Sequence, residues 1–269
     1  SYPSLDIDLL LVDAINRPKE FLYAHPEYYL TLRERARFWY TFFNYKHRYS
    51  IAAITGHKEF YGLDFYVNKN VLIPRPDTEL LVSEAINEIK KNTDADFALV
   101  DVGTGSGCIP ISILKNLPQP AQTYAIDISR KALRVAKKNA KKHSVSINFL
   151  HGNLLKPILK KYKIQAKKLI ITANLPYLTK AQFKKEPSIQ KEPKIALVAK
   201  KNGLALYENL CKQIKLLPTP YALYLLLEID PAQQQPITTL IKKHLPVATI
   251  ETKKDLAGLD RLVIVRVGI

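Results

Sequence analysis

An apolar, β-prone run ends in Asn174-Leu175-Pro176-Tyr177, which combines an amide, a proline and an aromatic ring. A strand that ends in this way can place the Asn174 side-chain oxygen, a backbone carbonyl and a flat ring around one point. Because Leu175 precedes a proline, it is biased to an extended conformation that keeps its carbonyl in one direction. The two oxygens can accept both hydrogens of a planar NH₂ group, on which Tyr177 could pack. We therefore expect a site that methylates a nitrogen, if a methyl donor binds nearby; an ordinary strand-ending turn is the alternative.

A glycine-rich turn earlier in the chain could bind such a donor. The run from Phe97 to Val102 predicts a buried strand, and Gly103-Thr104-Gly105-Ser106-Gly107 leads from it into a helix that begins near Cys108. Glycine permits positive φ and a close approach of the backbone to a ligand. A dinucleotide-binding fingerprint would have its third glycine at position 108, where this chain has cysteine. The compact spacing after Asp101 instead resembles the S-adenosyl-L-methionine loop of class I methyltransferases, although such turns also occur for structural reasons.

Two polar residues that follow the next predicted strands could complete a donor site. Asp127 ends a strand, where its carboxylate could accept both ribose hydroxyls of an adenosine; the alternative is an aspartate in a surface turn. Asn153 follows another strand, and its side-chain oxygen could accept from an adenine amino group while Leu154 covers the ring. Because ligands of parallel sheets bind at the carboxyl ends of the strands, we expect these residues to lie near Gly103 and Asn174.

Strands and helices alternate in the second part of the chain. Such alternation predicts a mainly parallel sheet with helices on both faces. We expect strands at 98–102, 123–127, 146–150, 168–173, 221–228, 247–252 and 261–267, and helices at 108–114, 129–142, 204–216 and 231–244. The polar, lysine-rich stretch 179–202 is expected to be a long excursion that faces the substrate.

The first 55 residues predict a small helical domain. Apolar residues recur at helical spacing in 5–12 and again in 28–45. The second segment is rich in aromatic residues, including Trp39, Tyr40 and Phe43. We expect these residues to form the core of the domain rather than a base-stacking platform, although some could line a surface that binds a protein partner.

A hairpin and a proline-rich turn are expected to follow. Between residues 59 and 73, two apolar runs flank Asn68-Lys69-Asn70 and predict a β-hairpin with its turn at these three residues. In the segment 74–79, two prolines keep Arg75 out of helical geometry, and the next residues can cap a helix. Capping does not account for an arginine between two prolines beside the donor loop. Arg75 is therefore a candidate for binding the substrate.

The charge of the chain is strongly basic. The 41 basic and 24 acidic residues give a formal net charge of +17. Such an excess speeds encounters with nucleic acid or acidic proteins but does not define a fold. The lysine pairs are spread along the sequence and lack interleaved aromatic residues. Both readings therefore stay open: a solvated basic surface, or a patch that contacts nucleic acid or the ribosome.

Composition also sets expectations about location and metal binding. Hydrophobic residues make up 47% of the chain, and no apolar run approaches the roughly 18 residues of a membrane span. No export leader opens the sequence, and the two cysteines, Cys108 and Cys211, form no disulfide framework. The histidines show no metal-ligand spacing. We expect a cytoplasmic monomer with no metal site and no contact with membranes.

Several segments together resemble one enzyme family over nearly the whole chain. In order they are Ile73-Pro74-Arg75-Pro76-Asp77-Thr78-Glu79-Leu80-Leu81-Val82, Asp101 to Gly107, Asn174 to Tyr177, Glu192-Pro193 with Ala196-Leu197, Asn202-Gly203-Leu204 and Lys254-Asp255-Leu256-Ala257-Gly258-Leu259-Asp260-Arg261. This pattern is similar to the HemK/PrmC family, the peptide chain release factor glutamine N5-methyltransferases. The segments around Arg75 and Asp255 are far more specific than the glycine turn.

The resemblance implies a reaction, a donor and a domain plan. It implies methylation of the side-chain amide nitrogen (N5) of the glutamine in the Gly-Gly-Gln motif of class 1 release factors. The donor would be S-adenosyl-L-methionine, the product S-adenosyl-L-homocysteine. Gly103 to Gly107, Asp127 and Leu154 would contact the donor, with Asn153 and Asn174, and Asn174 to Tyr177 the glutamine. The fold would be a class I, Rossmann-like α/β methyltransferase domain at 75–269, joined by a β-hairpin at 56–74 to an all-helical substrate-recognition domain at 1–55.

Two departures from the family pattern keep other functions open. The family usually has proline where this chain has Leu175, and Asn-Leu-Pro-Tyr also resembles the motif of rRNA adenine dimethyltransferases. The family often has an acid at the position of Asn153; asparagine keeps an acceptor oxygen. The alternatives are an adenine-N6 methyltransferase of RNA or DNA, a glutamine methyltransferase of a ribosomal protein, and a basic binding protein without activity.

Overall fold

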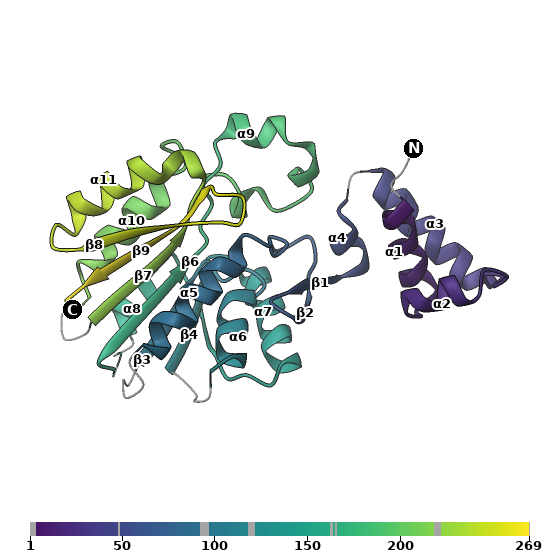
Figure 1. The fold of residues 1–269 in the computed structure, drawn as a ribbon, viewed down its shortest axis with the longest axis horizontal. Helices are drawn as coiled ribbons and strands as arrows, with labels where there is room; N and C mark the ends of the chain where they lie inside the picture. Colours follow the sequence, from purple (N-terminus) through teal and green to yellow (C-terminus); the bar gives the residue numbers. More distant parts are fainter. Residues whose placement is uncertain are drawn as a thin grey trace.

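The protein consists of a large α/β domain with a smaller group of helices projecting from one side (Figure 1). The computed structural model describes residues 4–47, 49–91, 97–117, 122–161, 164, 166–217 and 222–268. The alternation of strands and helices seen in the sequence therefore produces the α/β fold class that was expected.

Within the described ranges, one seven-stranded sheet forms the centre of the large domain, in the order β5-β4-β3-β6-β7-β9-β8. The strands are β3 (Phe97–Val102), β4 (Gln122–Asp127), β5 (Asn148–His151), β6 (Lys168–Ala173), β7 (Ala222–Glu228), β8 (Thr249–Lys254) and β9 (Asp260–Val267). The first five strands in the spatial order pair in parallel, whereas β9 runs antiparallel to both neighbours. The chain leaves β3 toward β4 on one side and later returns to β6 on the other. Ligands of open α/β sheets bind at such a switch point.

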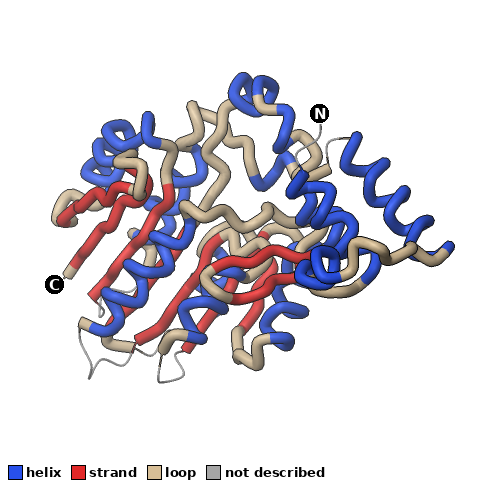
Figure 2. Tube along the Cα trace, turned by 45° about the vertical axis from the view of Figure 1, so that its right-hand side comes forward, coloured by secondary structure: helices blue, strands red, loops and turns tan. Residues whose placement is uncertain are grey.

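Helices cover both faces of the sheet (Figure 2). The helices α5 (Thr78–Lys90) and α6 (Cys108–Lys115) pack on one face, whereas α8 (Lys156–Lys161), α10 (Ala205–Ile214) and α11 (Gln234–His244) pack on the other. The helix α7 (Arg130–Lys142) follows β4. Successive residues of β3 alternate between the faces, so Val100 packs with the α10 side and Leu99 with the α5 side. The central strands are therefore apolar on both faces, as their sequences indicated.

The N-terminal group contains α1 (Ser4–Ile15), α2 (Lys19–Ala24), α3 (Leu32–Lys46) and α4 (Ile51–Thr55). Thr31 and Glu34 form a capping box at the start of α3, which satisfies backbone N–H groups of its first turn. The expectation that the aromatic residues of α3 form a core is wrong for three of them. Trp39, Tyr40 and Phe43 are 59%, 70% and 60% exposed, because their side of α3 faces away from α1 and α4.

The hairpin lies earlier than expected. Strands β1 (His57–Phe60) and β2 (Leu63–Tyr66) pair around Tyr61 and Gly62, both at positive φ, and not around Asn68-Lys69-Asn70. The later residues form a separate turn, in which the Asn68 side chain accepts from the Asn70 N–H at 2.9 Å. Residues 71–73 form no strand, although Val71 and Ile73 are buried; Val71 packs against α7. The domain boundaries at 55 and 74 stay a prediction.

The excursion expected between residues 179 and 202 folds as α9 (Lys180–Lys185) and two short 3₁₀ turns, η1 (Pro187–Ile189) and η2 (Lys194–Ala196). A parallel β-bridge between Leu178 and Val198 joins the last part of the excursion to the segment that follows β6. An ion pair between half-buried Arg75 and buried Glu192 joins it to the segment before α5. The excursion therefore lies over the carboxyl edge of the sheet.

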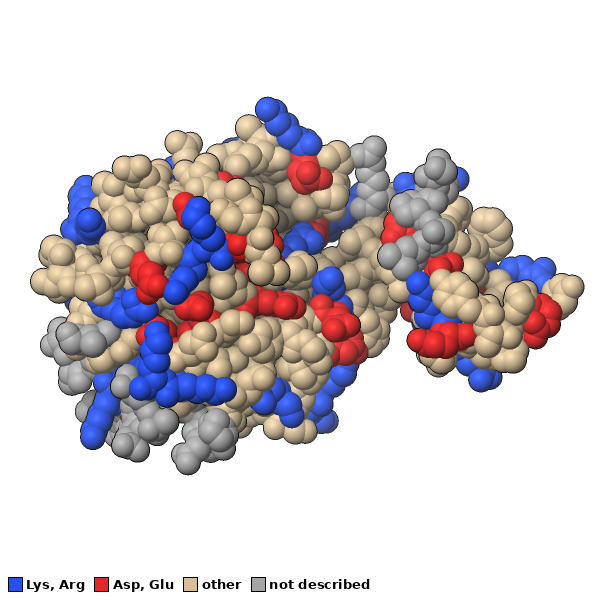
Figure 3. Space-filling model, viewed as in Figure 1, with Lys and Arg blue, Asp and Glu red and all other residues tan. Residues whose placement is uncertain are grey.

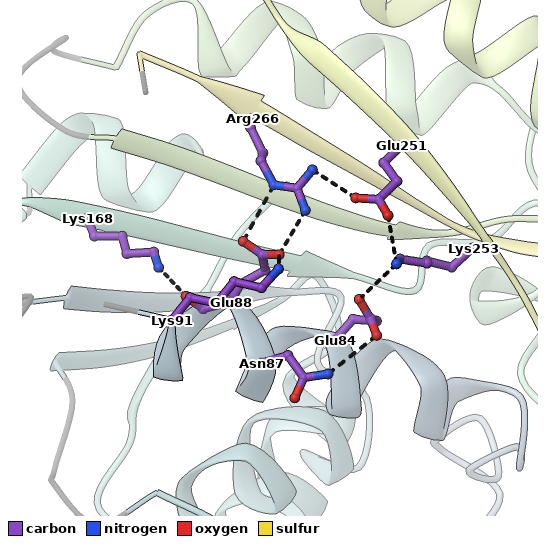
Figure 4. A network of polar contacts seen from close by, with 8 residues as sticks. All are labelled: Glu84, Asn87, Glu88, Lys91, Lys168, Glu251, Lys253 and Arg266. Atoms are coloured by element: carbon purple, nitrogen blue, oxygen red, sulfur yellow. Dashed lines mark hydrogen bonds and ion pairs between the residues drawn. The ribbon is translucent and has the colours of Figure 1, made fainter. Parts of the chain in front are cut away.

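Charged side chains are spread over the surface, and some of them form a network at the amino edge of the sheet. On the face drawn in Figure 3, lysine and arginine do not gather into one patch. At the amino edge of the sheet, Arg266 of β9 binds both Glu88 of α5 and Glu251 of β8 (Figure 4). Lys168 of β6 donates to the Glu88 carbonyl in the same network. These contacts tie α5 to three strands at the end opposite Asn174. None of the helices in the described parts is long and apolar enough to cross a membrane.

Candidate active site

A cavity opens at the carboxyl edge of the sheet, where β3, β4 and β6 end. Six of the nine residues expected to bind the donor line it: Gly103, Gly105, Asp127, Asn153, Leu154 and Asn174. Thr104, Ser106 and Gly107 lie outside its lining, and the side chains of the first two are buried. The sheet therefore brings together four segments, at Gly103, Asp127, Asn153 and Asn174, that lie far apart in the sequence. The roles of these residues stay predictions.

The glycine turn has the backbone that its composition indicated. Gly103, Gly105 and Gly107 adopt φ of 78°, 56° and 81°, in the left-handed region where a side chain is strained. A Cβ on Gly103 would lie 3.0 Å from Cδ2 of Leu175, and one on Gly107 would lie 3.2 Å from the Ala136 Cβ. The turn thus passes close to the Asn-Leu-Pro-Tyr segment and to α7, and leaves its concave side to the cavity.

Asp101 lies in β3, just before this turn. It is fully buried, and the Thr172 hydroxyl donates to its Oδ1 at 2.7 Å. Burial is the main reason why the pKa of Asp101 rises to about 6, while the hydroxyls of Thr104 and Thr172 oppose the rise. A carboxylate in this place acts as an acceptor inside the fold and does not reach the cavity.

Asp127 holds the turn through its backbone and still faces the cavity. Its Oδ2 accepts from the Gly105 N–H at 2.9 Å, and its Oδ1 accepts from the Ser129 N–H at 2.7 Å. Burial raises the pKa of Asp127, and the two backbone donors oppose this change. Each carboxylate oxygen has a second lone pair, so the group can also accept from two hydroxyls of a ligand.

Asn174 follows β6 directly, and its orientation is defined by one hydrogen bond. Its Nδ2 donates to Oγ1 of Thr78, the first residue of α5, at 3.1 Å. A side-chain amide presents its oxygen on the side away from its nitrogen. Oδ1 of Asn174 is thereby left free to accept from a ligand.

The backbone of the next residues is held by buried side chains. The Tyr207 hydroxyl donates to the Glu228 carbonyl and lies 3.4 Å from the Leu175 carbonyl. The Gln233 amide donates to the Tyr177 carbonyl at 3.1 Å. Tyr207 is fully buried and Leu175 is 3% exposed, so this part of the cavity wall is rigid although position 175 has leucine where the family usually has proline.

A second cavity, of about 160 Å³, adjoins the first. Its lining includes Arg75, Tyr177 and Glu228. Both cavities share Leu72, Asn174, Leu175, Pro176 and Ala196. Arg75 reaches this second cavity while its guanidinium binds Glu192, whose other oxygen accepts from the Ile73 N–H at 3.1 Å. Asn174 to Pro176 therefore form a partition between two chambers, one beside the glycine turn and one beside Arg75.

Comparison with known proteins identifies the family. A family model described as a methyltransferase domain matches residues 93–252. A release factor glutamine methyltransferase of Enterococcus faecalis is 39% identical over 220 residues, covering 80% of this chain and 75% of that protein. One from Koribacter versatilis is 32% identical over 266 residues, 98% of this chain and 91% of that protein. The chain belongs to the release factor glutamine methyltransferases.

Solved structures agree with a methyltransferase fold. The catalytic domain of human METTL16, in complex with the MAT2A 3′UTR hairpin 6, has a TM-score of 0.60 and 16% identity, covering 80% of this chain and 79% of that one. A methyltransferase from Pyrococcus furiosus has a TM-score of 0.54 and 15% identity, covering 83% and 97%. At these identities the likeness concerns the fold alone.

The site of this methyltransferase also contains residues that sequence reasoning missed. Thr78 was considered only as a helix cap, but it orients Asn174. Glu228 was considered only as the end of a strand, but its carboxyl group lines the second cavity. An acid that ends the apolar run of β7, beside the end of β6, was the available signal for Glu228. The signal for Tyr207, a polar group within an otherwise apolar helix face, was weaker.

The cavity has the chemistry that S-adenosyl-L-methionine would need. Gly103 and Gly105 provide a turn without side chains, Asp127 provides acceptors for a ribose, and Asn153 and Leu154 provide an amide and an apolar surface. Ile128, Ala132 and Leu206 make the remainder of the wall largely apolar, which suits an adenine ring.

Proposed function

We propose that this protein transfers a methyl group from S-adenosyl-L-methionine to the side-chain amide nitrogen of the glutamine in the Gly-Gly-Gln motif of class 1 release factors. The observation that carries this proposal is the partition at Asn174, Leu175 and Pro176, which lines both cavities. Donor and acceptor would enter from opposite sides and meet at an amide oxygen and a backbone carbonyl. The family to which the chain belongs supports the same substrate.

The residues of the partition would orient a poor nucleophile. The lone pair of an amide nitrogen is delocalised into its carbonyl group, so correct orientation and charge stabilisation matter most. Oδ1 of Asn174 and the Leu175 carbonyl oxygen would accept hydrogen bonds from the two N–H groups of the glutamine amide. These bonds would direct the nitrogen lone pair toward the donor cavity. As the new N–C bond forms, the electrons of the sulfur–methyl bond stay on sulfur and one amide proton leaves to water. The two oxygens would stabilise the positive charge that develops on nitrogen.

The donor side is assigned to the residues that line the first cavity. S-Adenosyl-L-methionine would supply a methyl group already activated by a sulfonium charge. Gly103 and Gly105 would approach its amino acid part, Asp127 would accept from the ribose, and Asn153 with Leu154 would contact the adenine. Thr104, Ser106 and Gly107 would shape the turn from outside the cavity.

Substrate recognition would extend beyond the glutamine. The excursion fastened by the ion pair between Arg75 and Glu192 covers the second cavity and would contact the residues that flank the glutamine. The exposed rings of Trp39, Tyr40 and Phe43 offer the helical domain a surface for a protein partner. Aromatic residues of this kind are enriched at protein interfaces. We assign residues 1–55 to substrate recognition, with the enzyme acting as a cytoplasmic monomer.

Transfer of label from methyl-labelled S-adenosyl-L-methionine tests the proposal. A purified release factor and its Gly-Gly-Gln→Gly-Gly-Ala variant are offered side by side with ribosomal RNA. We expect label on the release factor that disappears in the variant, together with a gain of one methyl group on the glutamine by mass spectrometry. Label on the RNA alone would instead favour the adenine-N6 reaction, which Leu175 and the basic charge would then explain.

A further inference from the structure

Two segments that stood out in the sequence meet beside the partition. The first, residues 73–79, leads into α5, and the second, residues 254–261, contains the turn between β8 and β9. Because β9 runs antiparallel to β7, it begins at the carboxyl edge where the parallel strands end, and the Ile229 N–H donates to the Arg261 carbonyl at 2.9 Å. No described residue of the second segment lines either cavity, so this segment can affect the reaction only through contacts with other residues.

Arg261 is held in one orientation by Asp255. Nε and one terminal nitrogen of Arg261 donate to Oδ2 of Asp255, each at 3.2 Å. Oδ1 of Asp255 accepts from the N–H groups of Ala257 and Leu259 at 2.9 Å and 3.0 Å, which fixes the carboxylate within the turn. The side chains of Arg261 and Asp255 are only 14% and 10% exposed. The turn between the two strands therefore determines the direction in which the guanidinium points.

The same guanidinium also binds Asp77 at the start of α5. Nη2 of Arg261 lies 3.3 Å from Oδ2 of Asp77. Asp77 occupies the N-cap position of α5, but among the described residues its side chain makes no capping hydrogen bond. Its carboxylate instead joins α5 to β9. A planar guanidinium can bind two carboxylates at once in this fixed geometry, which a flexible ammonium group does not match.

The residue after Asp77 is Thr78, which contacts Asn174. Thr78 is 2% exposed, and its hydroxyl oxygen accepts from Nδ2 of Asn174 at 3.1 Å. The Thr78 N–H donates to the Arg75 carbonyl at 3.1 Å, and the Leu80 N–H donates to the Asp77 carbonyl at 3.3 Å, so these residues form one continuous turn. A displacement of Asp77 is therefore transmitted to the Thr78 hydroxyl. The two ends of a side-chain amide have nearly the same shape, so this hydrogen bond decides which end faces a ligand.

We propose that Arg261, acting through Asp77, is a positioning residue that holds Thr78 where it orients the Asn174 side-chain amide for methyl transfer. The inference rests on the proposed function, because it concerns how that same site meets its substrate. With the ion pair formed, Nδ2 of Asn174 faces Thr78 and Oδ1 faces the glutamine. Without the ion pair, the first turn of α5 can move, and the amide can adopt orientations in which its nitrogen faces the glutamine.

Three single substitutions measure the contribution of each contact. Asp77→Ala removes the carboxylate, Arg261→Gln keeps a polar side chain without the charge, and Thr78→Val removes the acceptor at nearly constant volume. We expect Asp77→Ala and Arg261→Gln each to lower kcat about fivefold, which is the upper limit for a partly exposed ion pair. Thr78→Val should lower kcat about tenfold or more, because the amide loses its partner directly. S-Adenosyl-L-homocysteine should bind all three variants with wild-type affinity.

A double variant shows whether Asp77 acts through Thr78. If it does, Asp77→Ala has nothing left to disturb once the hydroxyl is gone, so the double variant should have the kcat of Thr78→Val alone. A further fivefold loss in the double variant would mean that Asp77 acts by another route and would overturn the inference. Wild-type kcat in Asp77→Ala or in Arg261→Gln would overturn it as well.

Glu84→Ala provides the matched control. Glu84 is another acid of α5, and it lies 3.8 Å from Nζ of Lys253 in β8, so this pair also joins the helix to the same two-stranded unit (Figure 4). Glu84 lies further along α5 than Asp77 and outside the lining of both cavities. Its loss should leave kcat unchanged. An equal fall of kcat in Glu84→Ala and Asp77→Ala would show that any loosening of α5 has the same effect, and would overturn the role of Arg261.

A measurement without substrate separates this inference from the proposed function. The side-chain NH₂ signals of ¹⁵N-labelled Asn174, assigned by their loss in Asn174→Ala, report on its hydrogen bond to Thr78. In Asp77→Ala and Arg261→Gln these signals should shift toward their positions in Thr78→Val. If they shift but wild type labels no release factor, the proposed function fails and the positioning stands. If wild type labels the release factor and the signals of both variants keep their wild-type positions, the positioning fails.

Discussion

The backbone of Tyr177 passes so close to Gly203 that no side chain fits between them. A Cβ on Gly203 would lie less than 3 Å from the Tyr177 carbonyl oxygen and from Nε2 of Gln233, and Gly203 has a φ of 88°. The Gln233 amide uses this space to donate both to Tyr177 and, at 2.9 Å, to the Asn202 carbonyl. The end of the excursion, the start of α11 and the partition are thus fixed to one another at a glycine.

Gly203→Ala should therefore damage both the fold and the site. The new methyl group must displace the Tyr177 backbone or the Gln233 amide, and the residue must also keep a left-handed conformation. Together these effects should lower the free energy of unfolding by about 3 kcal/mol. Because the displacement acts on the partition, kcat should fall as well. Urea unfolding and methyl transfer measure the two effects.

Gly62→Ala is the matched control for that substitution. Gly62 has a φ of 69°, but a Cβ there would meet no atom within 4 Å. It should cost only the conformational strain, about 1 kcal/mol, and should leave kcat unchanged. Equal losses of stability in the two variants would mean that the contact with Tyr177 does not matter.

Asn174→Ala should separate methyl transfer from donor binding. The variant keeps the backbone carbonyl of Leu175 but loses the side-chain acceptor. We expect kcat to fall by about 100-fold or more, because an acceptor aimed at the developing charge is lost. Affinity for S-adenosyl-L-homocysteine, measured by calorimetry, should change by no more than roughly threefold.

Asn153→Ala should show the opposite pattern. Asn153 lines only the donor cavity, so its loss should weaken binding of S-adenosyl-L-homocysteine roughly tenfold. At saturating donor, kcat should stay near the wild-type value. Loss of donor affinity in Asn174→Ala that matches the loss in Asn153→Ala would contradict the role assigned to Asn174.

Arg266→Ala should lower the free energy of unfolding and leave the rate of methyl transfer unchanged. Arg266 binds Glu88, which is 2% exposed, at the amino edge of the sheet. Burial alone would raise the pKa of Glu88, but the hydrogen bonds from Arg266 and Lys91 outweigh it and lower the pKa. Removal of the arginine leaves a buried carboxylate without its main partner, at a cost of about 3 kcal/mol.

The control for Arg266 is an exposed ion pair. Lys212 binds Glu208 at the surface of α10, so Lys212→Ala should change stability little. Urea unfolding at pH 7 compares the two variants, and methyl transfer at 25 °C should be normal in both. A loss in Arg266→Ala no larger than in Lys212→Ala would show that the network at this edge is dispensable.

The sequence predicted local elements well and long-range contacts poorly. Strand β6 has the expected bounds, Lys168–Ala173, because its apolar run is continuous and has clear ends. The hairpin turn was missed because Tyr61 and Gly62 lie inside an apolar run, whereas the more obvious Asn68 to Asn70 forms a separate turn. The spacing of apolar residues cannot show which of two nearby turns joins the paired strands.

Within the site, the motifs located the partition but not what holds it. Asn174 was recognised from its own neighbourhood, whereas Thr78 lies 96 positions away and Tyr207 acts from another helix. Contacts of this kind arise only when the sheet brings the carboxyl ends of β6 and β7 beside α5 and α10. The exposure of Trp39 could not be seen for a similar reason, because it depends on which face of α3 packs against α1.

Glu228→Gln should make the protein more stable than wild type at alkaline pH. Burial raises the pKa of Glu228 from 4.5 to about 7 in the folded protein. The folded state therefore keeps its proton up to about pH 7, whereas the unfolded chain loses it near pH 4.5, so unfolding becomes easier as the pH rises between these values. Glutamine does not titrate. The stability of the variant relative to wild type should thus increase between pH 5 and pH 8, by up to about 3 kcal/mol. Glu88→Gln removes a carboxyl group of lowered pKa, which is ionised in both the folded and the unfolded state between pH 5 and pH 8, so its stability relative to wild type should stay nearly constant over that range. Urea unfolding at both pH values measures the differences. If the free energy of unfolding changes with pH equally in wild type and Glu228→Gln, the pKa of Glu228 is not raised in the folded protein.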